Sequence, residues 1–185
     1  MSENVITFIG TNKLLASQFR NKGFLVEEFG RHTIPKIDFT DQNLNNQILS
    51  ILSKTKSYKF IISSGFLQSK NINEQEYSER INSFLINSIG PVVVTELILN
   101  QINNAKVFIM GSESGYKGSF DLTYALAKSS LRMFVKQRAV QENQQLLLIS
   151  PSTITDWGMT KRRNDLKNLQ KIKNDHPKKR FLNSL

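Results

Sequence analysis

Short apolar runs rich in β-branched residues alternate with helical patterns along most of the chain. Six such runs predict strands at residues 5–9, 24–26, 34–37, 59–62, 107–110 and 145–149. These runs are apolar on both sides, as strands are in a parallel sheet that is buried on both faces. The pattern therefore predicts an α/β fold in which a parallel sheet lies between two layers of helices.

The helical patterns show expected ends and one internal break. Asp41 is expected to cap a helix over residues 44–52. A long pattern over about residues 74–102 contains Pro91 in its middle. Because proline removes a helical hydrogen bond, this helix should bend or restart there. A further helix is expected from residue 122 to about residue 141.

The length and the charge distribution indicate one domain with a basic end. The 185 residues suffice for a single domain with a sizeable core. Residues 161–185 contain nine Lys or Arg and two Asp, a net +7 of the total +10, so residues 1–160 are nearly neutral. No aromatic residue interrupts these charges before Phe181, so we expect no nucleic-acid partner. We expect a domain over residues 1–160 and a solvated, flexible basic segment over residues 161–185.

Several classes of protein are excluded by composition. The chain has no Cys and only two His, which excludes disulfides and thiolate metal sites. Its N-terminal stretch lacks the charged start and apolar centre of a signal peptide. No uninterrupted apolar run approaches the roughly 18 residues of a membrane span. We therefore expect a cytoplasmic protein with no bound metal and no membrane partner.

Tyr124 and Lys128 lie four residues apart in an expected helix, so their side chains share one face. An ammonium close to a phenol stabilises the phenolate and lowers the pKa of the tyrosine from roughly 10. Such a tyrosine can exchange a proton with an alcohol or a carbonyl near neutral pH. The same spacing suits a Tyr packed on the core beside a Lys in water, so the pair alone leaves both interpretations open.

Further residues at the expected strand ends extend this pair. Ser112 and Gly115 follow the strand over residues 107–110, and Tyr124 comes 12 residues after Ser112. Asn87 lies in the long helix before the same strand. With these features the chain resembles the short-chain dehydrogenases/reductases, which are NAD(P)-dependent oxidoreductases. The resemblance implies a Rossmann-like, doubly wound parallel sheet in three α/β/α layers.

The resemblance also implies a catalytic tetrad of Asn87, Ser112, Tyr124 and Lys128. Ser112 would donate a hydrogen bond to a carbonyl oxygen, and Tyr124 would give or take its proton. Lys128 would bind the nicotinamide ribose, and Asn87 would hold a water that links Lys128 to solvent. Structural alternatives remain open. Ser112 could be a turn residue, and Ser114 could take its catalytic role. Asn87 could form hydrogen bonds to the backbone near Pro91.

The dinucleotide loop departs from the family pattern Thr-Gly-x-x-x-Gly-x-Gly. The family's glycines let the backbone approach the pyrophosphate at a helix N-terminus. Only Gly10 is kept, and Leu14 and Ala16 replace the other two glycines. Residues 63–65 replace the family's Asn-Asn-Ala-Gly motif. Arg31 follows the second strand, at the position where NAD-preferring members of the family usually have an acidic residue. The resemblance therefore favours NADP(H) over NAD(H). The alternative is that Arg31 is an ordinary surface residue.

Two more segments complete the expected cofactor site. Asp38 and Phe39 resemble the pair that flanks the adenine, and residues 151–154 resemble the family's Pro-Gly turn with its downstream Thr. The residues expected to bind the dinucleotide are Gly10, Thr11, Asn12, Lys13, Leu14, Leu15, Arg31, Asp38, Phe39, Ser63, Ser64, Gly65, Tyr124, Lys128, Pro151, Thr153 and Ile154. The family continues with a further helix and a seventh strand, so we expect about six strands here and no final helix or strand.

Two functions from different classes follow from these features. The first is an NADP(H)-dependent oxidoreductase that interconverts a carbonyl and an alcohol on a small molecule. The second is a degenerate relative without catalysis that serves as a binding or regulatory subunit, which Leu14 and the short C-terminus favour. A nucleotide-sugar epimerase or dehydratase shares Tyr-x-x-x-Lys but is normally larger. Many relatives are oligomers in which the Tyr helix packs against its twin, so we expect a homodimer or homotetramer.

Overall fold

The computed structural model describes residues 4–10, 12–68, 70–154 and 166–175. Within them, five strands form one parallel sheet in the order β2-β1-β3-β4-β5. The strands are β1 (Val5–Ile9), β2 (Leu25–Phe29), β3 (Lys59–Ile62), β4 (Lys106–Met110) and β5 (Gln145–Ile149). The helices are α1 (Lys13–Asn21), α2 (Leu44–Leu52), the 3-10 turn η1 (Ile72–Glu74), α3 (Tyr77–Phe84), the π-helix η2 (Leu85–Ile89), α4 (Gly90–Gln101), α5 (Ser114–Lys117), α6 (Leu122–Gln137) and α8 (Leu166–Asp175).

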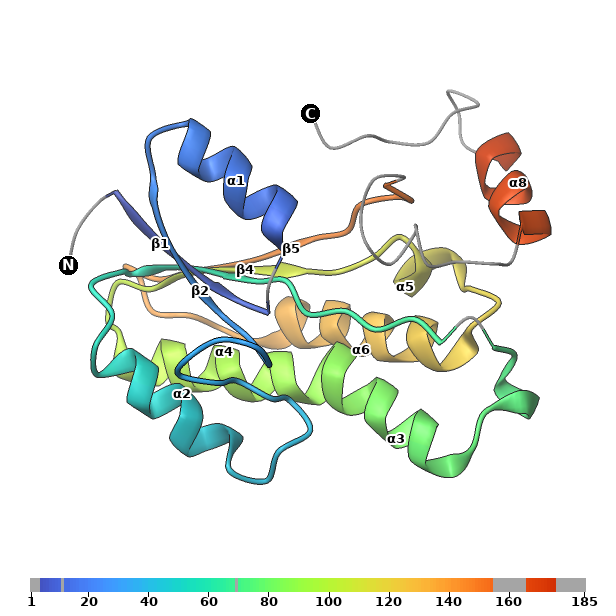
Figure 1. The fold of residues 1–185 in the computed structure, drawn as a ribbon, viewed down its shortest axis with the longest axis horizontal. Coiled ribbons are helices and arrows are strands. Elements are labelled where there is room, and N and C mark those ends of the chain that lie inside the picture. Colours follow the sequence, from blue (N-terminus) through green and yellow to red (C-terminus); the bar gives the residue numbers. More distant parts are fainter. Residues whose placement is uncertain (1–3, 11, 69, 155–165, 176–185) are drawn as a thin grey trace.

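Helices cover both faces of the sheet (Figure 1). On one face lies α1, and a small apolar cluster that includes Phe8, Ala16 and Ile61 fills the space beneath it. On the other face lie α2, α4 and α6 over the larger core, which includes Ile98 and Val107. β1 is buried at every residue because it has a strand on each side and helices on both faces. The predicted three-layer α/β/α fold is confirmed.

The expected strand at residues 34–37 is not part of the described sheet, which has one strand fewer than the six expected. Pro35 has no N–H to donate to a ladder, and the side chain of Ile34 is fully exposed. The hydroxyl oxygen of Thr33 instead accepts a hydrogen bond from the Gly30 N–H at 2.8 Å and lies 2.8 Å from the Pro35 carbonyl oxygen. These bonds close a turn, so the strand prediction was wrong here.

The long helical pattern restarts at its proline, as predicted. The π-helix η2 separates α3 from α4, which begins one residue before Pro91. In the wider π turn the Gly90 N–H donates to the carbonyl oxygen of Leu85, five residues earlier. This change of register accommodates Pro91, which has no N–H to donate. Gly90 also permits close packing, because a Cβ at this position would overlap the ring of Phe39.

Two helix ends differ from the sequence prediction. α6 ends at Gln137, where Arg138 leaves the helical conformation and forms an ion pair with Glu96 at 2.7 Å. The N-cap position of α2 is occupied by Asn43 and not by Asp41. Asp41 accepts a hydrogen bond from the Asn43 N–H at 2.8 Å, so it shapes the turn before the helix.

One helical stretch, Tyr77–Gln101, is long and apolar enough by length and composition to cross a membrane, with a mean hydropathy of 1.5. In this fold, 44% of the apolar window is buried, and Val94, Ile98 and Leu99 belong to the core. The core helix of a soluble protein meets the same criterion, so the hydropathy of this stretch matches its position against the sheet.

The expected basic segment over residues 161–185 is described only in part. Its residues 166–175 form α8, drawn in red in Figure 1. The other residues of this segment lie outside the described part of the chain, and so does the prediction that the segment is flexible.

Candidate functional site

Part of the predicted site lies at the carboxyl ends of β1, β3 and β4, where Gly10, Ser63, Ser64 and the Lys128 amine meet. The chain leaves β1 toward one side of the sheet and β3 toward the other, and ligands of such folds bind at this reversal. Gly10, directly after β1, has a φ of +85°, and a Cβ on it would lie 2.7 Å from the Ser64 nitrogen. The Ser63 hydroxyl donates a hydrogen bond to the Gly10 carbonyl oxygen. The loops after β1 and β3 are therefore in direct contact, and glycine is required at position 10.

Tyr124 and Lys128 are buried together on α6, with exposed fractions of 5% and 2%. The Lys128 Nζ lies 5.8 Å from the centre of the Tyr124 ring. The same amine donates hydrogen bonds to the carbonyl oxygens of Met110 at 3.0 Å and Ser64 at 3.3 Å. These contacts bring the pair to the ends of β4 and β3, and they contradict the alternative of a Lys in water.

Burial lowers the pKa of Lys128 from 10.5 to about 7. The cause is the loss of hydration, which disfavours the ammonium form. None of the ion pairs found among the described residues involves this amine. The charge of Lys128 therefore changes near neutral pH, and with it the stabilisation that the amine offers to a nearby phenolate.

Ser112 follows β4 after Gly111 and is partly buried. Its hydroxyl oxygen accepts a hydrogen bond from the Ser114 N–H at 3.1 Å, at the start of α5. This bond uses an oxygen lone pair and leaves the Ser112 O–H able to donate. The adjacent Glu113 N–H donates to the Pro151 carbonyl oxygen at 3.0 Å, so Ser112 lies near the segment that follows β5.

Asn87 is fully buried in η2, and its amide binds the backbone of Phe66 twice. The Oδ1 atom accepts from the Phe66 N–H at 2.9 Å, and Nδ2 donates to the Phe66 carbonyl oxygen at 2.7 Å. Nδ2 also lies 3.2 Å from the Ser83 hydroxyl. The side chain thus holds the loop after β3, a backbone partner far from the proline. The proposed water stays a prediction.

The N-terminus of α1, where a pyrophosphate would bind, is capped by its own chain. Asn12 Oδ1 accepts a hydrogen bond from the Leu15 N–H at 3.1 Å. This N–H is one of the unpaired donors that helix N-termini offer to phosphates. Leu14 is 42% exposed on the same turn, and Lys13 is exposed beside it. Ala16 is fully buried, and its small side chain permits close packing of α1 on the sheet.

A cationic residue follows β2, next to the loop after β1. The Gly10 N–H donates to the Phe29 carbonyl oxygen at 2.8 Å, so the loops after β1 and β2 are neighbours. Arg31, two residues after β2, is exposed. The residues present would suit a dinucleotide in three respects: Gly10 leaves room for a close backbone approach, Arg31 is an exposed guanidinium near the loop after β1, and the Lys128 amine lies at the ends of β3 and β4.

Asp38 and Phe39 lie farther along the loop from β2. The Asp38 carboxylate accepts a hydrogen bond from the Thr40 hydroxyl at 2.7 Å and lies 3.3 Å from the Lys36 ammonium. Burial raises the pKa of Asp38, but the hydrogen bonds from Thr40 and the charge of Lys36 outweigh it, so the pKa is lower than usual. The Phe39 ring is buried against Gly90 in the core, so it faces away from solvent.

The remaining predicted cofactor residues are placed less closely. Gly65 is exposed, while Pro151, Thr153 and Ile154 are half-buried after β5. Thr11 lies outside the described residues.

Three residues outside the predicted catalytic and cofactor-binding set support this site, and of these only Gly115 was singled out in the sequence. A Cβ on Gly115 would lie 2.9 Å from the backbone of Lys128, so this glycine allows α5 to pack on α6. Asp121 caps α6 by accepting a hydrogen bond from the Tyr124 N–H at 3.0 Å. Gln75 is buried and bonded to Asp121 at 3.1 Å. An Asp directly before a helical pattern is a local signal that would have identified Asp121; the other two residues act through long-range contacts.

No protein-family model matches the sequence, and no curated protein sequence matches it either. Solved structures match its fold. Aldohexose dehydrogenase from Thermoplasma acidophilum matches 97% of this chain and 82% of its own, with a TM-score of 0.80 and 15% identity. A short-chain dehydrogenase/reductase family oxidoreductase from Burkholderia thailandensis matches 99% of this chain and 81% of its own, with a TM-score of 0.80 and 15% identity. ElxO, solved with NADP bound, matches 98% of this chain and 87% of its own, with a TM-score of 0.81 and 16% identity. The chain has the fold of the short-chain dehydrogenases/reductases.

Proposed function

We propose that the protein is an NADP(H)-dependent oxidoreductase that interconverts a carbonyl and an alcohol on a small molecule, with Tyr124 as the general acid and base. The observation that carries this proposal is the burial of Tyr124 beside Lys128 at the carboxyl ends of β3 and β4. Lysine is almost never buried to this extent without an ionic partner. A strongly shifted pKa is typical of functional sites, which favours chemistry over packing.

In the proposed reaction each residue of the tetrad has a separate task. Bound dinucleotide supplies or accepts the hydride. Tyr124 donates its phenolic proton to the carbonyl oxygen during reduction and takes it back during oxidation. The Ser112 O–H donates to the same oxygen and stabilises the negative charge that develops there. Lys128, when protonated, stabilises the phenolate, and Asn87 holds the loop after β3 in place.

The choice of NADP(H) rests on charge. Gly10 and the first turn of α1 would hold the pyrophosphate, and Arg31 would bind the 2′-phosphate through its planar guanidinium. Lys13, exposed on the first turn of α1, adds positive charge. Two proteins of similar fold, ElxO and BdcA, were solved with NADP and NADPH. These features support NADP(H) over NAD(H).

A second candidate function is a binding or regulatory subunit without catalysis. The Asn12 side chain already occupies the Leu15 N–H, which a pyrophosphate would need. The Leu14 side chain lies on the same turn, where the family has glycine. Both features would oppose dinucleotide binding. A protein with this second function would accordingly have no affinity for either dinucleotide.

We also propose that the protein assembles as a homo-oligomer through α6. Three apolar side chains on one stripe of α6 are exposed, and two more are exposed on the neighbouring α3 and η2. They are Leu122 (41%), Leu126 (49%), Met133 (57%), Ile81 (43%) and Ile89 (49%). Exposed apolar stripes of this kind favour burial against another surface.

The deciding experiment is a calorimetric titration of the protein with NADPH and NADH, followed by turnover measurements on a panel of small aldehydes and ketones. We expect saturable binding of NADPH that is tighter than binding of NADH. Tyr124→Phe should retain NADPH binding and lower kcat by about 10²-fold or more, because it removes only the transferred proton. Tyr77→Phe, at a tyrosine that is 78% exposed, is the matched control and should behave like the wild type.

Three results would change the proposal. Absence of binding at millimolar dinucleotide would leave the non-catalytic subunit. Turnover that survives Tyr124→Phe would exclude Tyr124 as the acid and base. Equal affinity for the two dinucleotides would remove the assigned role of Arg31.

A further inference from the structure

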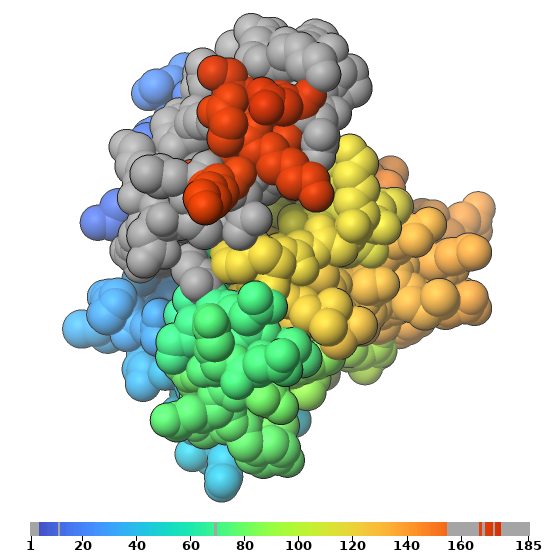
Figure 2. Space-filling model, turned by 90° about the vertical axis from the view of Figure 1, so that its right-hand side faces the viewer, coloured from blue at the N-terminus to red at the C-terminus, as the bar shows by residue number. Residues whose placement is uncertain are grey.

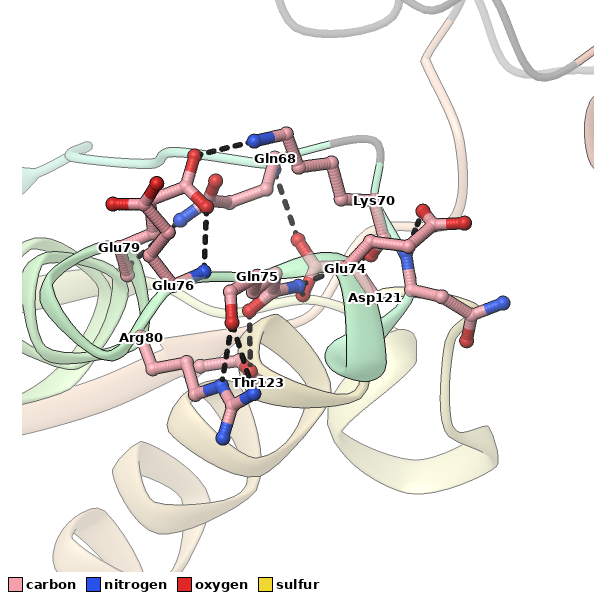
Figure 3. Close-up of polar contacts among 10 residues, drawn as sticks. Gln68, Lys70, Glu74, Gln75, Glu76, Glu79, Arg80, Asp121 and Thr123 are labelled. Carbon is pink, nitrogen blue, oxygen red and sulfur yellow. Dashed lines mark hydrogen bonds and ion pairs between the residues drawn. The ribbon is translucent and has the colours of Figure 1, made fainter.

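The loop between β3 and α3, described at residues 63–68 and 70–76, lies beside the first turn of α6, and polar side chains join the two (Figure 3). In Figure 2 the green region of this loop and α3 adjoins the yellow region of α5 and α6 at the surface. The residues that form the connection are Gln68, Gln75, Asp121 and Thr123, and they are called the latch below.

Asp121 is the centre of the latch, and its side chain is fully buried. Its Oδ1 atom accepts hydrogen bonds from the Tyr124 N–H at 3.0 Å and from Gln75 Nε2 at 3.1 Å. Its Oδ2 atom accepts from the Gln68 N–H at 2.9 Å. None of the ion pairs found in the described part of the chain includes Asp121, so these three hydrogen bonds compensate its burial.

Helix capping alone does not account for an aspartate at this position. Ser, Thr or Asn caps a helix N-terminus with a single side-chain oxygen. A carboxylate has two acceptor oxygens: Oδ1 of Asp121 accepts from the helix and from the Gln75 side chain, and Oδ2 accepts from the Gln68 N–H of the loop. An asparagine would keep one acceptor but would turn an NH₂ group toward an N–H donor. The second oxygen therefore connects the loop to α6.

Gln75 fastens the far end of the same loop and is 3% exposed. Besides its bond to Asp121, Nε2 donates to the Lys70 carbonyl oxygen at 3.0 Å. Its Oε1 atom accepts from the Thr123 hydroxyl at 2.8 Å. The Arg80 guanidinium donates to the Gln75 carbonyl oxygen at 2.9 Å. Every polar atom of the Gln75 side chain is bonded, so the loop is held at both ends against α6.

The beginning of the loop is held by the predicted site itself. The Lys128 amine bonds the Ser64 carbonyl oxygen, and the Asn87 amide bonds both backbone groups of Phe66. Lys128 lies one turn from Tyr124 on α6. The contacts thus form a closed ring, which runs from the Tyr124 backbone through the latch and along the loop to Lys128, and back along the helix.

We propose that Asp121 is a positioning residue for proton transfer, because it fixes Tyr124 relative to the loop that holds the Lys128 amine. The inference rests on the proposed function, since positioning matters to the rate only where Tyr124 exchanges a proton. A displacement of about 1 Å at a reacting group costs about 10²-fold in rate. The pyrophosphate would lie at Gly10 and α1, so the loss should appear in kcat more than in the KM for NADPH.

The first test compares turnover of Asp121→Asn with that of the wild type, with NADPH and the same carbonyl panel. Asn keeps the acceptor that caps the helix and binds Gln75 but loses the bond from the Gln68 N–H, so kcat should fall roughly tenfold or more while the KM for NADPH changes by less than about threefold. Thr123→Val, which removes only the bond to Gln75, should show a smaller loss in kcat. Glu74→Gln, an exposed carboxylate of the same loop whose amide still accepts from Asn71, is the matched control.

The second test does not depend on turnover. Tyrosine labelled at the phenol carbon gives four NMR signals, and Tyr124→Phe identifies the signal of Tyr124. In Asp121→Asn the Tyr124 signal should shift and broaden, and its titration should move along the pH axis. In Glu74→Gln it should stay in place. If circular dichroism shows that Asp121→Asn does not fold, both the turnover test and the NMR test are made with Thr123→Val instead.

The outcomes separate this inference from the proposed function. A wild-type kcat and an unmoved Tyr124 signal in Asp121→Asn would overturn the positioning role. A wild-type protein without any NADPH turnover would refute the proposed oxidoreductase, and the NMR experiment would still decide whether the latch positions Tyr124. If Glu74→Gln impaired kcat and the KM for NADPH to the same degree as Asp121→Asn, the effect would be a general one of changing the loop. This result would also overturn the inference.

Discussion

Lys128 combines complete burial with partners that are carbonyl oxygens and not carboxylates. Carbonyl oxygens accept hydrogen bonds from the neutral and the charged amine alike, whereas a nearby negative charge would hold the proton against desolvation. The proton of Lys128 is therefore held weakly near pH 7.

This burial should make the stability of the fold depend on pH through Lys128. The amine has a pKa of about 7 in the folded chain and 10.5 in the unfolded chain, so the unfolded chain binds more protons between these values. The free energy of unfolding therefore rises with pH across this window. Relative to Lys128→Met, the wild type should gain a few kcal/mol from about pH 7 to about pH 10. Urea unfolding at a series of pH values measures this gain.

Lys136→Met is the control for that experiment, because Lys136 is exposed on the same helix. Its stability should follow the wild type at every pH. Parallel curves for the wild type and Lys128→Met would mean that the buried amine does not titrate in this range.

At the level of single residues, spacing along the chain predicted that the Tyr124 and Lys128 side chains lie together. Tyr124 and Lys128 share a helix face because they are four residues apart, and that follows from the sequence alone. The partners of these residues did not follow from it. The amine of Lys128 bonds to Ser64, and Asn87 bonds to Phe66, across separations of 64 and 21 residues. Periodicity within one element does not report contacts between distant loops.

Among the elements, α1 decides whether a dinucleotide can bind. Leu14 lies on its first turn, where a pyrophosphate would approach the N–H groups. Leu14→Gly should therefore lower the dissociation constant for NADPH severalfold, although glycine costs about 1 kcal/mol of stability in a helix. Calorimetry measures the affinity, and thermal unfolding measures the cost. Ser17→Gly, on the exposed side of the same helix, controls for the added flexibility.

If Leu14→Gly and Ser17→Gly bind NADPH with the same affinity, the Leu14 side chain does not obstruct the cofactor. The cap formed by Asn12 would then be the remaining feature of α1 that opposes dinucleotide binding.

The elements that sequence patterns misjudged have a common physical cause. Ile37 is fully buried, so residues 34–37 show the apolar character of a strand, yet the Ile37 N–H donates to the Gly30 carbonyl oxygen in a turn and not to a neighbouring strand. A side chain can be buried without its backbone pairing in a sheet, and an apolar sequence pattern indicates only that the side chains are buried. The break at Pro91 was predictable, but the π-helix that absorbs it was not, since it depends on the packing of Gly90 against Phe39.

For the whole molecule, alternation of strands and helices predicted the layers because parallel strands require crossover connections. The same alternation did not report how far the sheet extends. The sheet ends at β2 on one side and at β5 on the other among the described residues. Leu25 on β2 and Leu147 on β5 are exposed, which is typical of edge strands with incomplete cover.

The proposed assembly through α6 belongs to the whole molecule as well. Leu122, Leu126 and Met133 lie at spacings that place them on one stripe of α6. A two-fold interface brings the same patch of both subunits together, so one apolar stripe serves both sides. Substitution of Leu126 and Met133 by Glu places four charges in such an interface, which should convert a dimer of the wild type into monomers. Light scattering at micromolar concentration measures the mass.

The double variant should keep the circular dichroism spectrum of the wild type, because both side chains are exposed in the single chain. Leu25→Glu, at a residue that is 66% exposed on the far edge of the sheet, is the control and should keep the wild-type mass. A monomeric wild type would refute the assembly. A dimer that survives the double substitution would place the interface elsewhere. The dimer could also have higher NADPH turnover than the monomer. In that case the dimer contact would act on the candidate site through α6, because the partner subunit would stabilise the helix that carries Tyr124 from its outer face.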